Sequence, residues 1–445
     1  MRRDERLNMH NELAAIVGKE WVRPGSAVPE YAVDGIAPQV VLSPGSVGEL
    51  AEVLRRAHEA RWIVVPAGFG TGLGLGNPPS RVDVVITTQR LDRLVEYEPA
   101  DLTVSVEAGC SLARLNQILG ERGQWLPLNP PRPERATLGA IAAVEDFGSL
   151  RLGFGLTRDY VIGVTIVQAD GTIIKSGGRV VKNVAGYDLN KLFVGSHGTL
   201  GIITRLNFKL RPRPEADVTY ALWGGDLAHL EEAAGELARS ELAPAALDLL
   251  LAEAVRRCWA SSPVDGPVLL VRFMDSDPVV QYQVGQLQRW IAGIGLDASP
   301  VDAEAAVTLW RAIDDFPVDG GDVTLRMSVP RSEAFPMVDI VQRTLSAAAD
   351  DVAVLAYVGN GTIWVSAGYE DTEAARSRLV ASLKALRREC ERRSGHLILY
   401  RAPRALKREL DVWGDVGATA GLMRALKRQF DPHGILNPGR FVAGI

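Results

Sequence analysis

Hydrophobic and polar residues follow two different periods along the first half of the chain. Short apolar runs at residues 62–65, 82–87 and 161–167 are typical of buried strands. Ser46 and Glu49 have the spacing of a capping box ahead of a helical pattern that starts at Leu50. These patterns predict a strand-helix-strand start and further strands and helices up to residue 215, with a hairpin that turns at Asp170-Gly171.

The pattern changes after residues 211–215, a charged segment with two prolines that is typical of a domain exit. Strand-like runs then alternate with long helical segments, predicted at 226–239, 278–293, 332–348 and 371–393. We therefore expect an α+β fold with domains over 1–215 and 216–401 and a C-terminal segment over 402–445, with a helix near 417–430.

Composition narrows the class of protein. The chain has 49 Lys and Arg against 54 Asp and Glu, so we expect no nucleic-acid partner. No apolar run reaches the roughly 18 residues that a membrane-spanning helix needs, and residues 1–6 precede no apolar signal core. We expect a cytoplasmic protein. Cys110, Cys258 and Cys390 are widely scattered, so we expect buried thiols and place any iron–sulfur chemistry in a partner.

Glycines at alternating positions follow the strand at 62–65: Gly68, Gly70, Gly72, Gly74 and Gly76. Without side chains, such a loop turns tightly and directs several N–H groups into one concave surface, which suits a pyrophosphate. The loop is neither a P-loop nor the Gly-x-Gly-x-x-Gly fingerprint, and a flexible turn is the alternative. A second small-residue segment, 136–143, favours binding of a long, bent ligand.

Motifs along the chain resemble, in order, the FAD-binding oxidases of the vanillyl-alcohol oxidase type. The motifs are 66–76, 136–143, Arg158-Asp159, 182–189, 195–201 and Asn437-Pro438-Gly439-Arg440. The resemblance implies two α+β subdomains that bind FAD within 1–215. It also implies an α+β cap domain over 216–401 and a C-terminal segment that returns to the flavin.

The resemblance also implies which residues bind FAD. They are Pro66, Ala67, Gly68, Phe69, Gly70, Thr71, Gly72, Leu73, Thr137, Leu138, Gly139, Ala143, Gly155, Arg158, Asp159, Ile202, Ile203 and Asn437. Lys182 and Arg158 are candidates to neutralise phosphate charge. Members with covalent flavin carry His or Cys in or near the flavin loops, whereas the first loop here carries Phe69 and no histidine. We therefore expect non-covalent FAD.

Within this family the chain is most similar to the 2-hydroxyacid dehydrogenase branch, which includes glycolate oxidase subunits and D-lactate dehydrogenases. Its metal motif, His-x-Gly-Asp-Gly-Asn-x-His, aligns with residues 357–364, where Tyr357 and Trp364 replace both histidines. We therefore expect no metal. In its Trp-x-x-Arg-Glu segment, Ile313 replaces the arginine that binds the substrate carboxylate. Without these residues, the chain resembles the E-type FAD-binding subunit of glycolate oxidase. That subunit works beside a catalytic flavoprotein subunit and an iron–sulfur subunit.

Oxidation of a 2-hydroxy acid requires a base beside the hydroxyl and a cation beside the carboxylate. His396 is the preferred base, because histidine titrates near neutral pH, and His197 and His433 are alternatives. Arg326 is a candidate carboxylate partner and Tyr357 a candidate wall of the flavin site. Core packing or a surface position is the structural alternative for each of them.

Three functions therefore compete. The favoured one is an FAD-binding subunit of a glycolate oxidase-like complex that oxidises glycolate, lactate or a similar acid and passes electrons to a partner. A self-sufficient D-2-hydroxyacid dehydrogenase is the second, and a flavin-stabilised assembly subunit without turnover is the third. In each case we expect at most peripheral membrane association, through partners.

Overall fold

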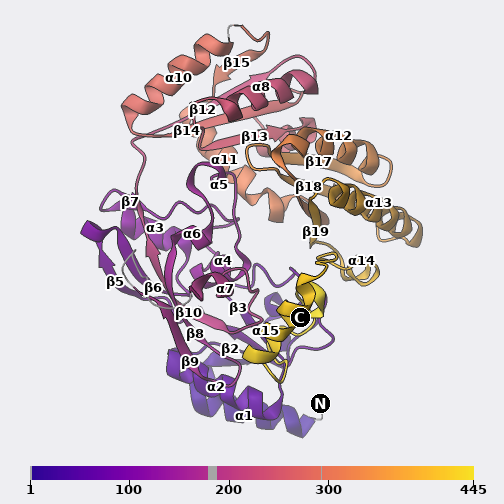
Figure 1. Cartoon of the computed structure of the whole chain (residues 1–445). Coiled ribbons are helices and arrows are strands. Elements are labelled where there is room, and N and C mark those ends of the chain that lie inside the picture. The colour runs from indigo at the N-terminus through magenta and orange to yellow at the C-terminus, as the bar shows by residue number, and fades with distance from the viewer. Residues whose placement is uncertain (1–2, 179–187, 292) are drawn as a thin grey trace.

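The computed structural model describes residues 3–178, 188–291 and 293–445. The chain forms a lower α+β region from its first half and an upper α+β region from its second half (Figure 1). The final residues, drawn in yellow, return to the lower region. The motif at 182–189, including Lys182, lies almost entirely outside the described residues.

The first sheet of the lower region has the strand order β1-β2-β4-β3, in which β2, β4 and β3 are parallel. Its strands are β1 (Val22–Pro24), β2 (Val40–Leu42), β3 (Val64–Ala67) and β4 (Val84–Thr87). Two helices, α1 (Arg3–Val17) and α2 (Val47–Ala60), pack against each other beside it. The predicted cap of α2 is confirmed, because the Ser46 hydroxyl accepts the N–H of Glu49 at 3.1 Å.

The second sheet is antiparallel, with the order β5-β6-β10-β8-β9. Its strands are β5 (Leu94–Glu98), β6 (Thr103–Glu107), β8 (Val161–Val167), β9 (Ile173–Gly177) and β10 (Ile202–Lys209). The turn at Asp170-Gly171 confirms the predicted hairpin, and Gly171 supplies its positive φ of +86°. The helices of this part are α3 (Leu112–Gly120), α4 (Leu138–Val144), α5 (Arg151–Phe154), α6 (Thr157–Tyr160) and α7 (Asn190–Phe193). A short pair, β7 (Gln124–Trp125) and β11 (Arg211–Pro212), precedes the upper region.

The upper region contains one antiparallel sheet with the order β15-β12-β14-β13-β17-β18-β16-β19. Two consecutive β-α-β-β-α-β units build it, and they join where β13 pairs with β17. The first unit comprises β12 (Ala216–Trp223), α8 (Leu227–Arg239), β13 (Ala246–Leu250), β14 (Val268–Asp275), α10 (Asp277–Ile291) and β15 (Asp297–Pro300). The second comprises β16 (Val323–Ser328), α12 (Ala334–Leu345), β17 (Asp350–Tyr357), β18 (Thr362–Gly368), α13 (Glu373–Arg392) and β19 (His396–Arg401).

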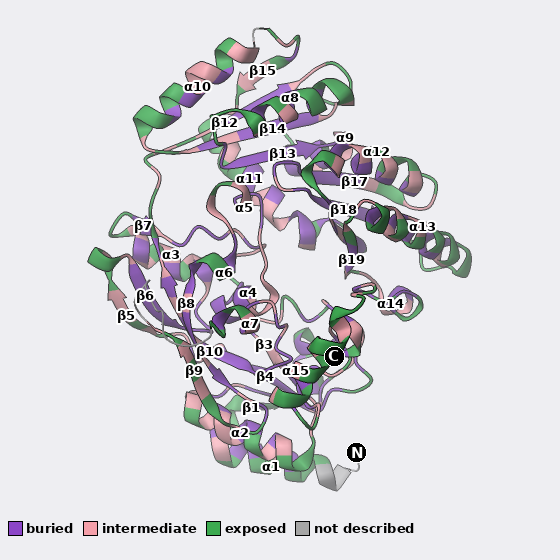
Figure 2. Cartoon of the chain, in the orientation of Figure 1, coloured by how far each residue is buried: buried purple, intermediate pink, exposed green. Residues whose placement is uncertain are grey.

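The two faces of this sheet have different cover. Helices α8, α10, α12 and α13 share one hydrophobic cluster with the sheet. Two further helices, α9 (Ala252–Cys258) and α11 (Ala303–Asp319), share a second cluster with its other face. Figure 2 shows the central strands of the sheet buried and the outer side of α10 exposed. The face covered by α9 and α11 turns toward the lower region (Figure 1), because Asn129 of the lower region donates to Asp314 of α11 at 2.7 Å.

Two expectations from composition can be compared with the fold. All three cysteines are free and buried, as expected. Across the described ranges, no helix combines the length and apolar character needed to cross a bilayer.

A buried ion pair fixes the C-terminal segment to the lower region. This segment holds α14 (Arg404–Glu409) and α15 (Thr419–Phe430). Near the end of α15, Lys427 Nζ lies 2.6 Å from the carboxylate of Asp431. The same carboxylate accepts the N–H groups of Ile435 and Leu436 at 3.0 and 2.8 Å. Leu436 in turn forms a parallel bridge with Val64 of β3.

Replacing Asp431 with Ala should therefore destabilise the protein by about 3–5 kcal/mol, because the lysine charge would stay buried without its partner. Asp339→Ala, which breaks an exposed pair with Arg343 on α12, should cost at most about 1 kcal/mol. Urea unfolding of both variants measures the difference. Equal destabilisation would show that the buried pair does not hold the segment.

Candidate FAD and substrate site

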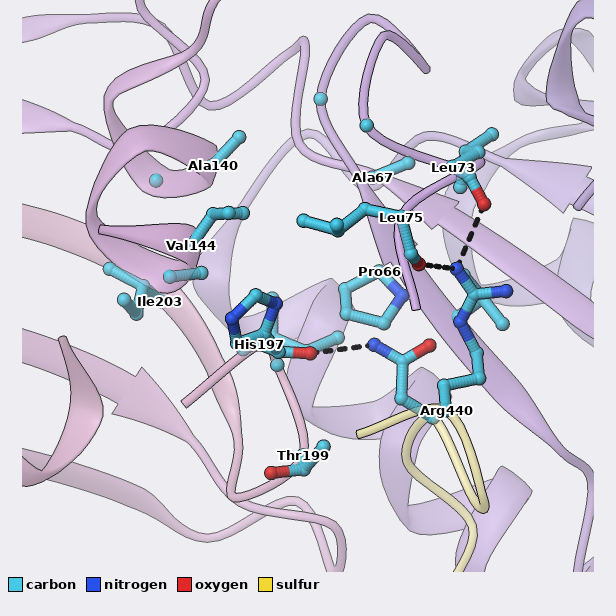
Figure 3. A pocket seen from close by; sticks show the side chains of 18 of the residues that line it. Pro66, Ala67, Leu73, Leu75, Ala140, Val144, His197, Thr199, Ile203 and Arg440 are labelled. Carbon is cyan, nitrogen blue, oxygen red and sulfur yellow. Dashed lines mark hydrogen bonds between the residues drawn. The ribbon is translucent and has the colours of Figure 1, made fainter. Parts of the chain in front are cut away.

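A cavity lies between the two sheets of the lower region and the C-terminal segment. Segments distant in sequence line it: the loop after β3, the helix α4, residues 197–203, and a set of residues from the C-terminal segment (Figure 3). The C-terminal set is Trp413, Asn437, Arg440 and Phe441. Residues from four separate segments therefore converge on one cavity.

Glycines allow the loop and α4 to approach closely. A Cβ on Gly68 would lie 2.4 Å from Thr137 Oγ1, the hydroxyl that caps α4 by accepting the N–H of Ala140 at 3.3 Å. A Cβ on Gly139 would lie 2.8 Å from the Cβ of Ala108. Gly70 has a φ of +81°, which other residues rarely adopt. Only glycine therefore allows the close packing seen at Gly68 and Gly139.

The lining of the cavity fits FAD. Around Gly72, which lines the cavity, no atom lies within 4 Å of where a Cβ would stand, so this part of the loop leaves space for a diphosphate. Asn437, at a positive φ of 47°, donates from Nδ2 to the carbonyl of His197 at 2.8 Å. Its Oδ1 is buried and has no hydrogen-bond partner among the described residues, so it is available as an acceptor.

Two cationic side chains of the C-terminal segment donate hydrogen bonds to backbone carbonyls of the glycine loop. Arg440 Nη2 donates to the carbonyls of Leu73 and Leu75 at 2.8 and 2.6 Å (Figure 3). Lys407 donates to the carbonyl of Gly74 and forms a buried pair with Asp34 at 2.6 Å. Backbone carbonyls of the loop are thus turned toward these cations.

His197 faces the cavity from the segment before β10. Its ring stacks on Phe441 at a centroid distance of 4.4 Å and meets Trp413 edge-on at 4.8 Å. Burial lowers the pKa of His197 to about 3, and the charges of Arg326 and Arg440 add to this shift. The ring is therefore neutral near pH 7.

Most of the predicted FAD-binding residues line the cavity. These are Pro66, Ala67, Gly68, Gly70, Thr71, Gly72, Leu73, Gly139, Ala143, Ile202, Ile203 and Asn437. Phe69, Thr137 and Leu138 belong to the same two segments without lining it. Gly155, Arg158 and Asp159 lie at α6, beside the cavity lining rather than in it.

The α6 residues have partners within the protein. Arg158 pairs with Glu145 at 3.3 Å, and Asp159 accepts the N–H of Leu156 at 2.8 Å. The first contact joins α6 to the residue that follows α4, and the second lies within the start of α6. Sequence reasoning missed Trp413 and Phe441, because isolated aromatic residues in an irregular segment form no motif.

The predicted carboxylate partner, Arg326, lies on β16 directly opposite Trp364 of β18. Its guanidinium carbon lies 5.5 Å from the ring of Phe147, 5.8 Å from Trp364 and 6.0 Å from Tyr400. Nη1 is buried without a hydrogen-bond partner in the part of the chain that the structure describes. Phe147 follows α4, so this cation lies where the upper sheet meets the FAD-side helix.

The other two predicted catalytic residues lie in different surroundings. His396 is exposed on β19, opposite Ser328, and its pKa is lowered by desolvation and by the charge of Arg326. Tyr357 is 1% exposed and belongs to the hydrophobic cluster that includes Trp364. The structure therefore brings Arg326 and His396 to neighbouring strands and places Tyr357 in the core, away from the cavity lining. The described ranges contain no group of three or more His, Cys, Asp or Glu arranged to hold a metal ion.

Comparison with known proteins agrees with this geometry. The model of the FAD binding domain family matches residues 38–177, and the model of the C-terminal domain of FAD linked oxidases matches residues 404–441. The chain is similar to p-cresol methylhydroxylase in its substrate-bound crystal structure, with a TM-score of 0.79 and 16% identity over 100% of this chain and 98% of that one.

Two relatives illustrate the sequence similarity. Glycolate oxidase subunit GlcD of Bacillus subtilis is 34% identical over 50% of this chain and 47% of its own length. The probable mitochondrial D-lactate dehydrogenase of Danio rerio is 28% identical over 96% of this chain and 90% of its own length.

The fold is that of p-cresol methylhydroxylase, and the cavity is lined by residues of the two segments that match FAD-binding family models. The chain carries the FAD binding domain and the C-terminal domain of FAD linked oxidases, and it is an FAD-linked oxidoreductase whose cofactor is FAD.

Gly68→Ala should weaken FAD binding about tenfold or more, equivalent to about 1.4 kcal/mol, because the new methyl group must displace Thr137 or the loop. Gly74→Ala is the matched control in the same loop, since no atom lies within 4 Å of its added methyl group. Titration of the apoproteins with FAD, followed by flavin fluorescence, measures both. Unchanged affinity in Gly68→Ala would contradict the close approach.

His197 should make stability depend on acid pH. Its folded-state pKa, about 3, lies below the ordinary value of 6.5, so the unfolded chain binds the extra proton and stability falls as the pH drops below about 6.5. His197→Phe should therefore lose less stability than the wild type between about pH 7 and pH 5. Urea unfolding at both pH values tests this, with His229→Gln on the exposed start of α8 as control. Parallel losses in His197→Phe and the wild type would show that the ring is not desolvated.

Proposed function

We propose that this chain oxidises a 2-hydroxy acid at non-covalently bound FAD and passes the electrons to a partner protein. One observation carries the proposal: a guanidinium with an unpartnered buried N–H, that of Arg326, lies among aromatic rings beside the helix that lines the FAD cavity. A carboxylate is the natural partner of such a group. The relatives named above, a glycolate oxidase subunit and a D-lactate dehydrogenase, support an acid of this class.

The proposed chemistry divides between cofactor and protein. FAD, when bound, accepts the hydride from the substrate Cα. Arg326 holds the carboxylate, which fixes the direction of the Cα–H bond. The rings of Phe147, Trp364 and Tyr400 around the guanidinium keep water from competing with the carboxylate. His396, on the neighbouring strand, is the sequence-based candidate for the base.

A second candidate function is a subunit of a glycolate oxidase-like complex whose own turnover depends on a catalytic flavoprotein subunit and an iron–sulfur subunit. Its support is the replacement of the family's metal ligands by Tyr357 and Trp364 and of its carboxylate-binding arginine by Ile313. The buried positions of Tyr357 and Ile313 are consistent with packing roles for both.

Anaerobic mixing of the FAD-loaded chain with glycolate and with D-lactate distinguishes these functions. We expect the flavin absorbance band to bleach with the isolated chain. Bleaching that requires added partner subunits would favour the complex. A flavin that stays oxidised in both cases would contradict the proposal and leave an assembly role.

Arg326→Gln should raise the apparent Kd of the reducing acid about 10- to 100-fold, because a charged hydrogen bond of about 1.5–3 kcal/mol is lost. Arg343→Gln, an exposed arginine on α12, is the control. The dependence of the flavin reduction rate on acid concentration gives the apparent Kd. An unchanged value in Arg326→Gln would exclude this arginine as the carboxylate site.

A further inference from the structure

A carboxylate that no sequence motif indicates lies beside Arg326. Asp146 comes two residues after α4, whose residues Ala143 and Val144 line the FAD cavity. One carboxylate oxygen accepts the N–H of Phe147 at 3.2 Å, and the other accepts the hydroxyl of Tyr400 at 3.2 Å. Tyr400 belongs to β19, so the carboxylate joins the FAD-side helix to the upper sheet.

Asp146 and Arg326 lie near each other without forming an ion pair. Phe147, the residue after Asp146, has its ring 5.5 Å from the guanidinium carbon, and the Tyr400 ring lies 6.0 Å from the same atom. The charge of Arg326 acts on Asp146, although no contact within 4.0 Å joins them in the described ranges. A 2-hydroxy acid has its hydroxyl one carbon from its carboxylate, so its two polar groups match a base and a cation that lie near each other.

The environment of Asp146 suits a base. The carboxylate is half-buried, and desolvation raises its pKa, which strengthens it as a proton acceptor. The charged and titratable groups that act on it are Arg326 from β16 and Tyr400 from β19, and its own charge acts on Tyr357 of β17. The charge of Arg326 and the Tyr400 hydrogen bond act in the opposite direction, because both favour the ionised carboxylate.

The neighbouring candidates are less suitable. Glu145 precedes Asp146, and Arg158 lies 3.3 Å from its carboxylate, so its charge is already paired. His396 is exposed and lies opposite Ser328, two residues along β16 from Arg326.

We propose that Asp146, held by the Tyr400 hydroxyl, accepts the hydroxyl proton of the 2-hydroxy acid that Arg326 binds. This assignment rests on the function proposed above. As the O–H bond breaks, its proton passes to Asp146, a C=O double bond forms, and the Cα hydrogen leaves as hydride to FAD. The acid is oxidised by two electrons to a 2-oxo acid and FAD is reduced by the same two.

The test compares anaerobic flavin reduction in Asp146→Asn and Asp146→Glu with the wild type. The rate at saturating acid should fall about 10²- to 10⁴-fold in Asp146→Asn, and Asp146→Glu should restore part of it. The wild-type rate should rise with pH along a single carboxyl ionisation that Asp146→Asn lacks. Asp339→Asn, on the exposed side of α12, is the control.

Tyr400→Phe tests the role of the hydroxyl and serves as the readout if Asp146→Asn does not fold. It removes a hydrogen bond that stabilises the ionised carboxylate, so the ascending limb of the pH profile should move to higher pH. Tyr369→Phe, whose hydroxyl donates to Asp371 at 2.9 Å on the surface, should leave the limb in place.

The apoprotein supplies a readout without turnover. A carboxyl whose pKa is raised on folding destabilises the fold as the pH rises through that pKa. In urea unfolding from about pH 4 to about pH 8, Asp146→Asn should therefore gain stability relative to the wild type as the pH rises.

Three results would overturn the assignment: a wild-type reduction rate in Asp146→Asn, a pH limb that His396→Gln removes and Asp146→Asn retains, or a stability difference independent of pH. A wild-type flavin that no 2-hydroxy acid reduces would instead overturn the proposed function, and the assignment with it.

Discussion

Buried charge that ties the C-terminal segment to the lower region is the interaction on which the cavity depends. Lys427 and Asp431 pair at 2.6 Å, and Asp431 fixes the backbone that pairs with β3. From this anchored backbone, Arg440 reaches back to the glycine loop. Without the pair, the wall that includes Phe441 would lose its attachment, and the loop would lose the cations behind its carbonyls. The cavity therefore has walls from both the glycine loop and the C-terminal segment.

The elements that sequence predicted well are those with a local chemical signal. The capping box at Ser46 and the hairpin turn at Gly171 carry such signals. In the upper region, long helical patterns predicted α8, α10, α12 and α13, whereas α9 and α11 were not predicted. Strand β13 was not predicted, because it is buried on both faces and its residues do not alternate. The two β-α-β-β-α-β units were not visible at all, since equal topology requires no equal residues.

Gly68 and Gly139 could be singled out from sequence because the backbone geometry there demands glycine, and both line the cavity. Prediction of the site was less complete where side chains from distant segments meet. Asp146 and Tyr400 are 254 residues apart, and only folding shows that their side chains touch. Tyr357 is a different case. Alignment with a motif singled it out, but the packing around β17 encloses its ring in the core.

The two walls of the cavity come from distant parts of the sequence, and this has a consequence for biosynthesis. Residues 65–75 form one wall and residues 413–441 another, so a ribosome makes the first long before the second. During that interval the nascent chain has the glycine loop but not the cations that orient it. A polypeptide that terminates before residue 413 would therefore lack one wall of this cavity and the cations that contact the loop.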